Sequence, residues 1–189
     1  MKNKKSKKRV SQADWLEKAL EILEIESLDE VKIDRLAKEL NVSRSGFYWH
    51  FDNRQALINA MIKYWGNEFT SVVTSNKKLF SLSPRERLYK TMKMIIENNL
   101  TQLELPMRAC AETDPVAKKL VNQVYQMRLE FIRSTLSEMG FGDEDLEMRT
   151  HLFVCYHTWE GNMFTNLSKA KRLRWLKLRL EMLCTPSSN

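Results

Sequence analysis

Apolar residues recur along most of this chain at spacings of three and four, the period of helices with one buried face. The first stripe follows Ser11, a residue that can cap a helix, and covers positions 12–25. A second stripe covers positions 33–40, and no stretch shows the sustained alternation of a half-buried strand. The sequence has five glycines and four prolines, so few positions break the pattern. We therefore predict an all-α protein.

Polar and helix-breaking residues divide this pattern into separate elements. Asn41 ends the second stripe, and asparagine tolerates the left-handed conformation that a tight turn into another helix requires. Pro84 and Pro115 stand where helices can begin, and residues 140–143 have the composition of a turn. The predicted helices span residues 12–25, 33–40, 44–50, 54–75, 84–99, 115–139, 144–166 and 169–183, with a short helical piece between Pro106 and Asp114.

The composition suits a soluble globular protein, with 43% hydrophobic and 29% charged residues among 189. No apolar run approaches the roughly 18 residues of a membrane span, and the basic amino-terminal segment lacks the apolar stretch of a secretory signal. Cys110, Cys155 and Cys184 are widely spaced and odd in number, which favours a reducing compartment over a disulfide framework. We expect a cytoplasmic protein with no membrane partner.

The net charge of +7 is unevenly distributed. Residues 2–9 carry six basic and no acidic side chains, whereas residues 11–65 carry seven basic and ten acidic ones. A basic terminus is usually a solubilising tail. Ahead of a DNA-binding element it can also add salt-sensitive affinity for phosphates. The body of the chain must then attract phosphates through a few well-placed side chains.

The most unusual stretch covers residues 42–51, with the sequence VSRSGFYWHF. Glycine and three consecutive aromatic residues are poor choices for a helix that only has to be stable. They suit a short helix that approaches another molecule closely. Arg44 and Ser45 lie in its first turn, where arginine can donate two hydrogen bonds to guanine in a major groove. Gly46 permits close approach, and two phenylalanines four residues apart can pack the helix onto its own core.

Polar side chains around this helix can contact phosphates. Tyr48 and His50 can donate hydrogen bonds, and Arg54 and Lys32 stand at the starts of the neighbouring helices, where free backbone N–H groups favour anions. Each residue also has a plain structural explanation, as a core aromatic or a solvated polar group. Their combination after a capping serine indicates the second helix of a helix-turn-helix.

The stretch from Ile33 to Leu57 resembles the signature of the TetR family of bacterial transcriptional regulators. The chain keeps the family's characteristic residues at six positions, which are Val42, Ser43, Tyr48, His50, Phe51 and Leu57. It has Asn41 where the family usually has glycine, and Arg54 where it usually has lysine. The motif covers about a quarter of the chain.

This resemblance implies a homodimer that binds a near-palindromic double-stranded DNA operator, acts as a repressor, and is released by a small effector. Arg44 and Ser45 would face bases, and Gly46 would allow the approach. Phosphates would be held by Lys32, Ser43, Tyr48, His50 and Arg54. Trp49 is at a variable position and would touch DNA or nothing.

Two apolar stripes near the carboxyl end suggest how a dimer could form. The last predicted helix carries Leu173, Leu176, Leu180 and Leu183, and the helix before it carries Leu152, Tyr156, Trp159 and Met163. Two such helices can form a four-helix interface with their symmetry copies, or they can be ordinary core of one chain. The resemblance favours the dimer.

A ligand pocket would lie among the middle helices. Its candidate lining residues are Met94, Asn98, Met107, Cys110, Met127, Phe131, Cys155 and Trp159. Methionine and aromatic residues at helical spacing are more often core than ligand contacts. If the pocket exists, its lining predicts a hydrophobic or amphipathic effector.

Three alternatives remain open: a DNA-binding regulator without a ligand, a protein-interaction module, and a metal-binding or catalytic helical protein. His151 and Cys155 share a helix face, but no third ligand follows at a zinc-like spacing and no catalytic motif is present. We expect no enzyme, cofactor or metal. The expected organisation is a basic arm (1–10), a helix-turn-helix domain (11–53), a linking helix (54–75), and an effector-binding and dimerisation domain (76–189).

Overall fold

The computed structural model describes residues 10–186, so the basic segment of residues 2–9 lies outside the described part. This part contains helices and no strand, which confirms the all-α prediction. None of its helices is both long enough and apolar enough to cross a lipid bilayer. The chain forms two compact units that divide between Tyr64 and Trp65, within the expected linking helix.

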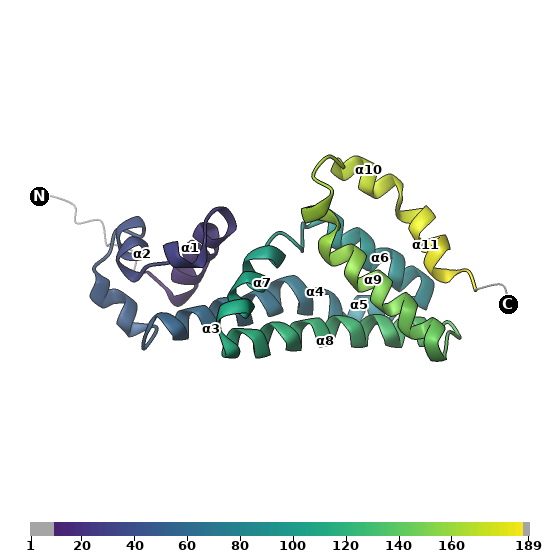
Figure 1. Ribbon diagram of the computed structural model, residues 1–189, viewed down its shortest axis with the longest axis horizontal. Helices are drawn as coiled ribbons and strands as arrows, with labels where there is room; N and C mark the ends of the chain where they lie inside the picture. Colours follow the sequence, from purple (N-terminus) through teal and green to yellow (C-terminus); the bar gives the residue numbers. More distant parts are fainter. Residues whose placement is uncertain (1–9, 187–189) are drawn as a thin grey trace, which may run out of the picture. The chain divides into compact units, whose positions relative to one another are not determined.

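The amino-terminal unit is built from short helices (Figure 1). Its elements are α1 (Gln12–Ile25), η1 (Leu28–Glu30), α2 (Ile33–Glu39), η2 (Arg44–Trp49) and α3 (Arg54–Trp65). Ser11 and Asp14 form a reciprocal capping box at the start of α1. The predicted stripe of α1 is buried, and Trp15 packs edge-on against Phe47 of η2 at 5.4 Å between ring centroids. The core of this unit therefore holds η2 from the inside.

Asn41 makes the turn between α2 and η2. Its φ of 54° is left-handed. Val42 donates its N–H to the Ala37 carbonyl at 2.9 Å, and Asn41 donates to Lys38 at 3.1 Å. This pair of bonds is the Schellman arrangement that ends a helix on a left-handed residue. The conformation predicted from the sequence is confirmed.

The element after this turn is a 3₁₀ helix over Arg44–Trp49 rather than the α-helix expected over 44–50. Ser43 precedes it, but no side-chain capping bond forms. Instead the Ser43 and Ser45 hydroxyls hydrogen-bond each other at 2.8 Å. Asn53 precedes the next helix, and its side-chain oxygen accepts a hydrogen bond from the Ala56 N–H at 2.9 Å.

The expected single helix over 54–75 is interrupted. α3 ends at Trp65 and is followed by a π-helical segment, η3 (Gly66–Ser71), and one turn of α4 (Val72–Thr74). A Cβ on Gly66 would lie 2.9 Å from the Val124 side chain, so glycine allows this backbone to approach the helix that carries Val124. Close packing against another helix is invisible to a periodicity argument.

The carboxyl-terminal unit is a helical bundle around one apolar core. After α4 it contains α5 (Lys77–Phe80), α6 (Pro84–Glu97), α7 (Glu104–Thr113), α8 (Pro115–Ser137), α9 (Asp143–Met163), α10 (Lys169–Arg174) and α11 (Leu176–Cys184). α8 packs against α7 and α9, and α10 and α11 pack against α6. The predicted final helix is broken at Trp175, and α5 and η1 were not predicted.

Candidate functional site

The residues of η2 divide sharply into an inner and an outer set. Phe47 is fully buried and Phe51 is 4% exposed, with their rings 5.3 Å apart. The outer set is Ser43, Arg44, Ser45, Tyr48 and Trp49, all exposed, with Trp49 at 78%. The helix is thus anchored by its phenylalanines and presents a polar and aromatic face to solvent.

Arg44 lies at the centre of this exposed face. Its Nη2 donates to the Tyr48 hydroxyl at 3.3 Å, and its Nη1 is 3.3 Å from Asp34 Oδ1. The hydrogen bond with Tyr48 and the charge of Asp34 raise the pKa of Arg44, so the guanidinium stays charged. Because all three side chains are exposed or partly exposed, the guanidinium can exchange these partners for a ligand.

Several of the other predicted phosphate contacts already have partners within the chain. Lys32 Nζ pairs with Glu30 at 3.1 Å. His50 is half-buried, with Nε2 3.1 Å from the Val10 carbonyl oxygen. Gly46 does not need to be glycine for internal packing, since a Cβ there would lie 3.9 Å from Trp15.

Arg54 has a structural role that the sequence did not reveal. Its Nη2 donates to the Leu28 carbonyl at 2.6 Å and its Nε donates to the Val31 carbonyl at 2.9 Å. Arg54 therefore fixes the η1 turn to the start of α3. Any contact of this side chain with a phosphate must coexist with these bonds or replace them.

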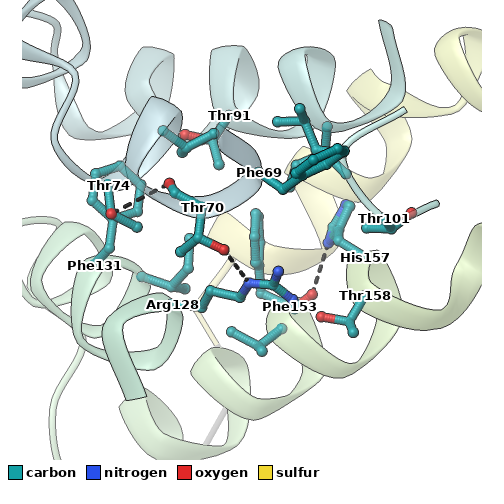
Figure 2. Close-up of a pocket in the computed structure, with 15 residues that line it drawn as sticks. Phe69, Thr70, Thr74, Thr91, Thr101, Arg128, Phe131, Phe153, His157 and Thr158 are labelled. Carbon is teal, nitrogen blue, oxygen red and sulfur yellow. Dashed lines mark hydrogen bonds between the residues drawn. The ribbon is translucent and has the colours of Figure 1, made fainter. Parts of the chain in front are cut away.

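A small cavity lies within the carboxyl-terminal unit (Figure 2). Its volume is about 50 Å³. The lining is largely apolar and includes Phe69, Phe131 and Phe153. Five threonines, Arg128 and His157 add polar groups; the threonines are Thr70, Thr74, Thr91, Thr101 and Thr158.

Of the predicted pocket residues, the structure places Phe131 in this lining. Met107 and Cys110 are buried, and Met94 and Trp159 are half-buried, but none of these four lines the cavity. Asn98, Met127 and Cys155 are exposed. Methionines were predicted to line the pocket, whereas the threonines, Arg128 and His157 of the lining were not. Phe153 and His157 lie one turn apart on α9, and this spacing is the sequence pattern that could have indicated the lining.

His157 is buried, and its ring is tilted against Phe153 at a centroid distance of 4.2 Å. Nδ1 lies 2.8 Å from the Phe153 carbonyl oxygen, which can only accept a hydrogen bond. Burial lowers the pKa of His157 to about 4, an effect that the Phe153 bond opposes only in part. The imidazole is therefore neutral near pH 7.

A buried ion cluster lies beside this histidine. Glu160 on α9 is fully buried and is 3.1 Å from both Arg172 of α10 and Arg179 of α11. Tyr156 donates its hydroxyl to the same carboxylate at 3.0 Å. Burial opposes ionisation of Glu160, but the two guanidinium groups outweigh it and lower the pKa of the carboxyl. The cluster joins three helices of the bundle.

The predicted interface residues fall into two groups. Leu176 and Leu180 lie in the apolar core of their own unit, and Leu173 and Leu183 pack against that core. Leu152 and Met163 are exposed, while Tyr156 is half-buried. The leucine seam of the last helix is thus intrachain core.

An open face of α9 and α11 includes Leu152, Tyr156 and Leu183 of the predicted interface. Its residues line a surface groove; the apolar ones with high exposure are Leu152 (55%), Trp175 (36%), Leu178 (60%) and Met182 (71%). Met148 (60%) is also exposed on α9. Contiguous apolar surface of this kind marks interaction sites.

His151 and Cys155 are both exposed on α9. His151 Nδ1 hydrogen-bonds the Glu147 carbonyl at 2.7 Å. No group of three or more histidine, cysteine or acidic side chains within residues 10–186 could hold a metal ion.

A short helix with an exposed polar face, set after a tight turn from another helix, defines a helix-turn-helix protein. Residues 16–61 match the sequence model described as bacterial regulatory proteins, tetR family. The match covers the helix-turn-helix segment, which is of the tetR-family type. An uncharacterised HTH-type transcriptional regulator of Bacillus subtilis, YuxN, is 29% identical over 86 residues, a match that covers 45% of this chain and 29% of that protein.

Solved structures share the fold over nearly the whole chain. A transcriptional regulator from Rhodococcus sp. RHA1 has a TM-score of 0.74 at 12% identity, covering 92% of this chain and 96% of its own. FadR from Bacillus subtilis, in complex with stearoyl-CoA, has a TM-score of 0.72 at 15% identity, and the match covers 93% of this chain and 98% of FadR. A regulator from Saccharomonospora viridis, in complex with choline, has a TM-score of 0.69 at 16% identity, and the match covers 90% of this chain and 93% of that protein. At these identities the likeness concerns the fold alone.

Proposed function

We propose that this chain is a cytoplasmic transcriptional repressor that binds a palindromic DNA operator as a homodimer and is released by a small effector. The observation that carries the proposal is the division of η2 into buried phenylalanines and an exposed face centred on Arg44. Residues 11–53 are the DNA-binding domain, and residues 76–189 bind the second subunit and most of the effector. Residues 54–75 link the two parts and add Phe69 to the effector cavity.

Each predicted contact residue has a proposed role on DNA. Arg44 reads a guanine with its two guanidinium donors and Ser45 contacts a neighbouring base. Phosphates are held by Lys32, Ser43, Tyr48, His50 and Arg54. Gly46 allows the backbone to approach the duplex, and Trp49 lies at its edge. The basic segment of residues 2–9 adds charge that helps to offset the acidic balance of residues 11–65.

Selection of bound duplexes from random DNA, followed by gel-shift titration, tests this proposal. Arg44→Ala is expected to weaken binding to the selected operator about ten- to a hundredfold and to relax preference at one base position per half-site. Arg108→Ala is the matched control, because it removes an exposed arginine from α7 and should leave both quantities unchanged. Failure to enrich any sequence would contradict the proposal.

Tyr48→Phe separates phosphate contact from base reading. Loss of the hydroxyl should weaken all duplexes alike, because phosphates carry no sequence information. Tyr48 also accepts a hydrogen bond from Arg44. A change in the preferred sequence, measured in the same titrations, would show instead that Tyr48 acts by orienting Arg44.

The dimer is proposed to form through the exposed face of α9 and α11. Leu178→Glu would bury a charge in each half of a two-fold interface and should raise the dimer dissociation constant about a hundredfold or more. Sedimentation equilibrium measures this constant. Val116→Glu is the control, since Val116 is 50% exposed on α8. A monomeric wild-type protein, or an unaffected dimer, would reject this interface.

The effector is proposed to bind in the cavity lined by Phe69, Phe131 and Phe153. Its apolar walls support a hydrophobic or amphipathic molecule. The structural relatives in complex with stearoyl-CoA and choline bind small molecules of very different size. Release of the operator by a metabolite library, measured by gel shift, tests the role; a regulator without a ligand would show no release.

A further inference from the structure

Two polar side chains of the cavity lack a hydrogen-bond partner among the described residues. They are His157, at Nε2, and Thr91, at Oγ1, and each residue is 2% exposed. Figure 2 shows His157 bonded to the Phe153 carbonyl through one edge of its ring, with the other edge turned away from it. Buried polar groups are normally satisfied, so both atoms call for a partner from outside the described residues.

The backbone determines what His157 can offer such a partner. Because the Phe153 carbonyl accepts from Nδ1, the proton of the neutral ring is on Nδ1. Burial keeps the ring neutral by lowering its pKa to about 4. Nε2 therefore presents a lone pair, and a partner at this nitrogen must donate a hydrogen. The Thr91 hydroxyl can donate or accept.

The formal charge next to the cavity is already compensated. Arg128 Nη2 is 2.7 Å from Glu104 Oε1, and Arg128 Nε donates to the Thr70 hydroxyl at 3.0 Å. The Arg128 guanidinium also lies over the rings of Trp65 and Tyr125. A carboxylate ligand would have to compete with Glu104 for this cation and would face the lone pair of His157. An anion is therefore disfavoured.

We propose that the cavity binds the hydroxyl or N–H end of a small uncharged molecule, with His157 Nε2 accepting its hydrogen and Thr91 Oγ1 as the second polar partner. The inference rests on the proposed effector site and names the chemical class that the site takes. A volume of about 50 Å³ is well below the roughly 150 Å³ of an apolar cavity that holds benzene. The lining must therefore rearrange around a ring-sized ligand, or the cavity takes the polar end of a larger one.

Calorimetric titration of the full chain without DNA, using phenol, toluene and benzoate, tests the proposal. Phenol should bind about five- to tenfold more tightly than toluene, the effect of one hydrogen bond, and benzoate should bind most weakly. Equal affinities for phenol and toluene, preferred binding of benzoate, or no saturable binding of phenol would each overturn it. If water alone occupies the cavity, phenol will show no saturable binding, and this result also overturns the proposal.

Matched variants locate the effect. Thr91→Val removes the hydroxyl and keeps the shape, and His157→Phe removes the lone pair and keeps a ring; each should reduce the preference for phenol to about twofold or less. Thr150→Val is the control, because its Oγ1 is also buried without a partner among the described residues but does not line the cavity. Equal losses in Thr91→Val and Thr150→Val would overturn the assignment.

The ligand assignment and the proposed function can fail separately. Phenol-selective binding that left operator affinity unchanged would retain the assignment and reject the effector role. Operator release by a carboxylate metabolite, without preference for phenol over toluene, would retain the effector role and reject the assignment. Gel shifts with the selected operator, run beside the calorimetry, separate these outcomes.

Discussion

Glu160→Gln is expected to lower the free energy of unfolding by about 3–5 kcal/mol. The amide keeps the shape of the carboxylate but leaves the charges of Arg172 and Arg179 without their buried counter-ion, and removal of one member of a buried ion pair costs about this much. The two arginine Nε atoms already lack partners among the described residues, so no other acceptor in that part of the chain replaces the lost carboxylate. Urea denaturation monitored by circular dichroism measures the change.

Two further variants sharpen this test. Glu147→Gln breaks the exposed pair with Arg133 and should have a much smaller effect, because solvent screens that pair. Replacement of Glu160, Arg172 and Arg179 together by methionine should recover much of the lost free energy, since an apolar cluster of similar volume has no charge to desolvate. A small loss in Glu160→Gln would show that water compensates the arginines.

The stability of the protein is expected to fall between pH 6.5 and pH 4 because of His157. The folded protein holds this ring neutral down to a pKa of about 4, whereas the unfolded chain takes up a proton near the ordinary value of 6.5. Proton uptake by the unfolded state favours unfolding, so the contribution is complete above pH 6.5 and is lost as the pH falls towards 4. The total loss is about 3 kcal/mol.

Denaturation curves at several pH values measure this slope. His157→Phe should remove most of it, because the variant has no titrating group at this position. His151→Gln replaces an exposed histidine of the same helix and should retain the wild-type slope. An unchanged slope in His157→Phe would mean that other groups set the pH dependence.

The sequence predicted the amino-terminal unit closely because its signals are local. The stripe of α1, the cap at Ser11 and the left-handed turn at Asn41 depend on neighbours within a few residues, and the structure has all three. The division of η2 into inner phenylalanines and outer polar residues followed from the same reasoning. Local patterns predicted these features, but they did not predict the 3₁₀ geometry of η2 or the hydrogen bonds of Arg54 to the η1 turn.

The sequence predicted the carboxyl-terminal unit less well because its decisive contacts join distant residues. Periodicity showed that the leucines of α11 lie on one face, but the direction of that face depends on where α6 and α9 pack. Gly66, the first residue of the π-helical segment, packs closely against Val124, which is 58 positions away in the chain. Thr91 and His157 meet in one cavity from different helices, and neither is unusual in its own segment.

The 3₁₀ geometry of η2 changes its reach along a groove. Six residues that rise about 2.0 Å each span about 12 Å, whereas six residues of an α-helix span about 9 Å. Side chains three positions apart, such as Ser45 and Tyr48, also stand in one column instead of being offset around the axis. Rules that assign recognition-helix positions to base pairs assume α-helical spacing, so they do not apply unchanged to η2. Neighbouring side chains of η2 should contact base pairs that are spaced further apart than those rules assume.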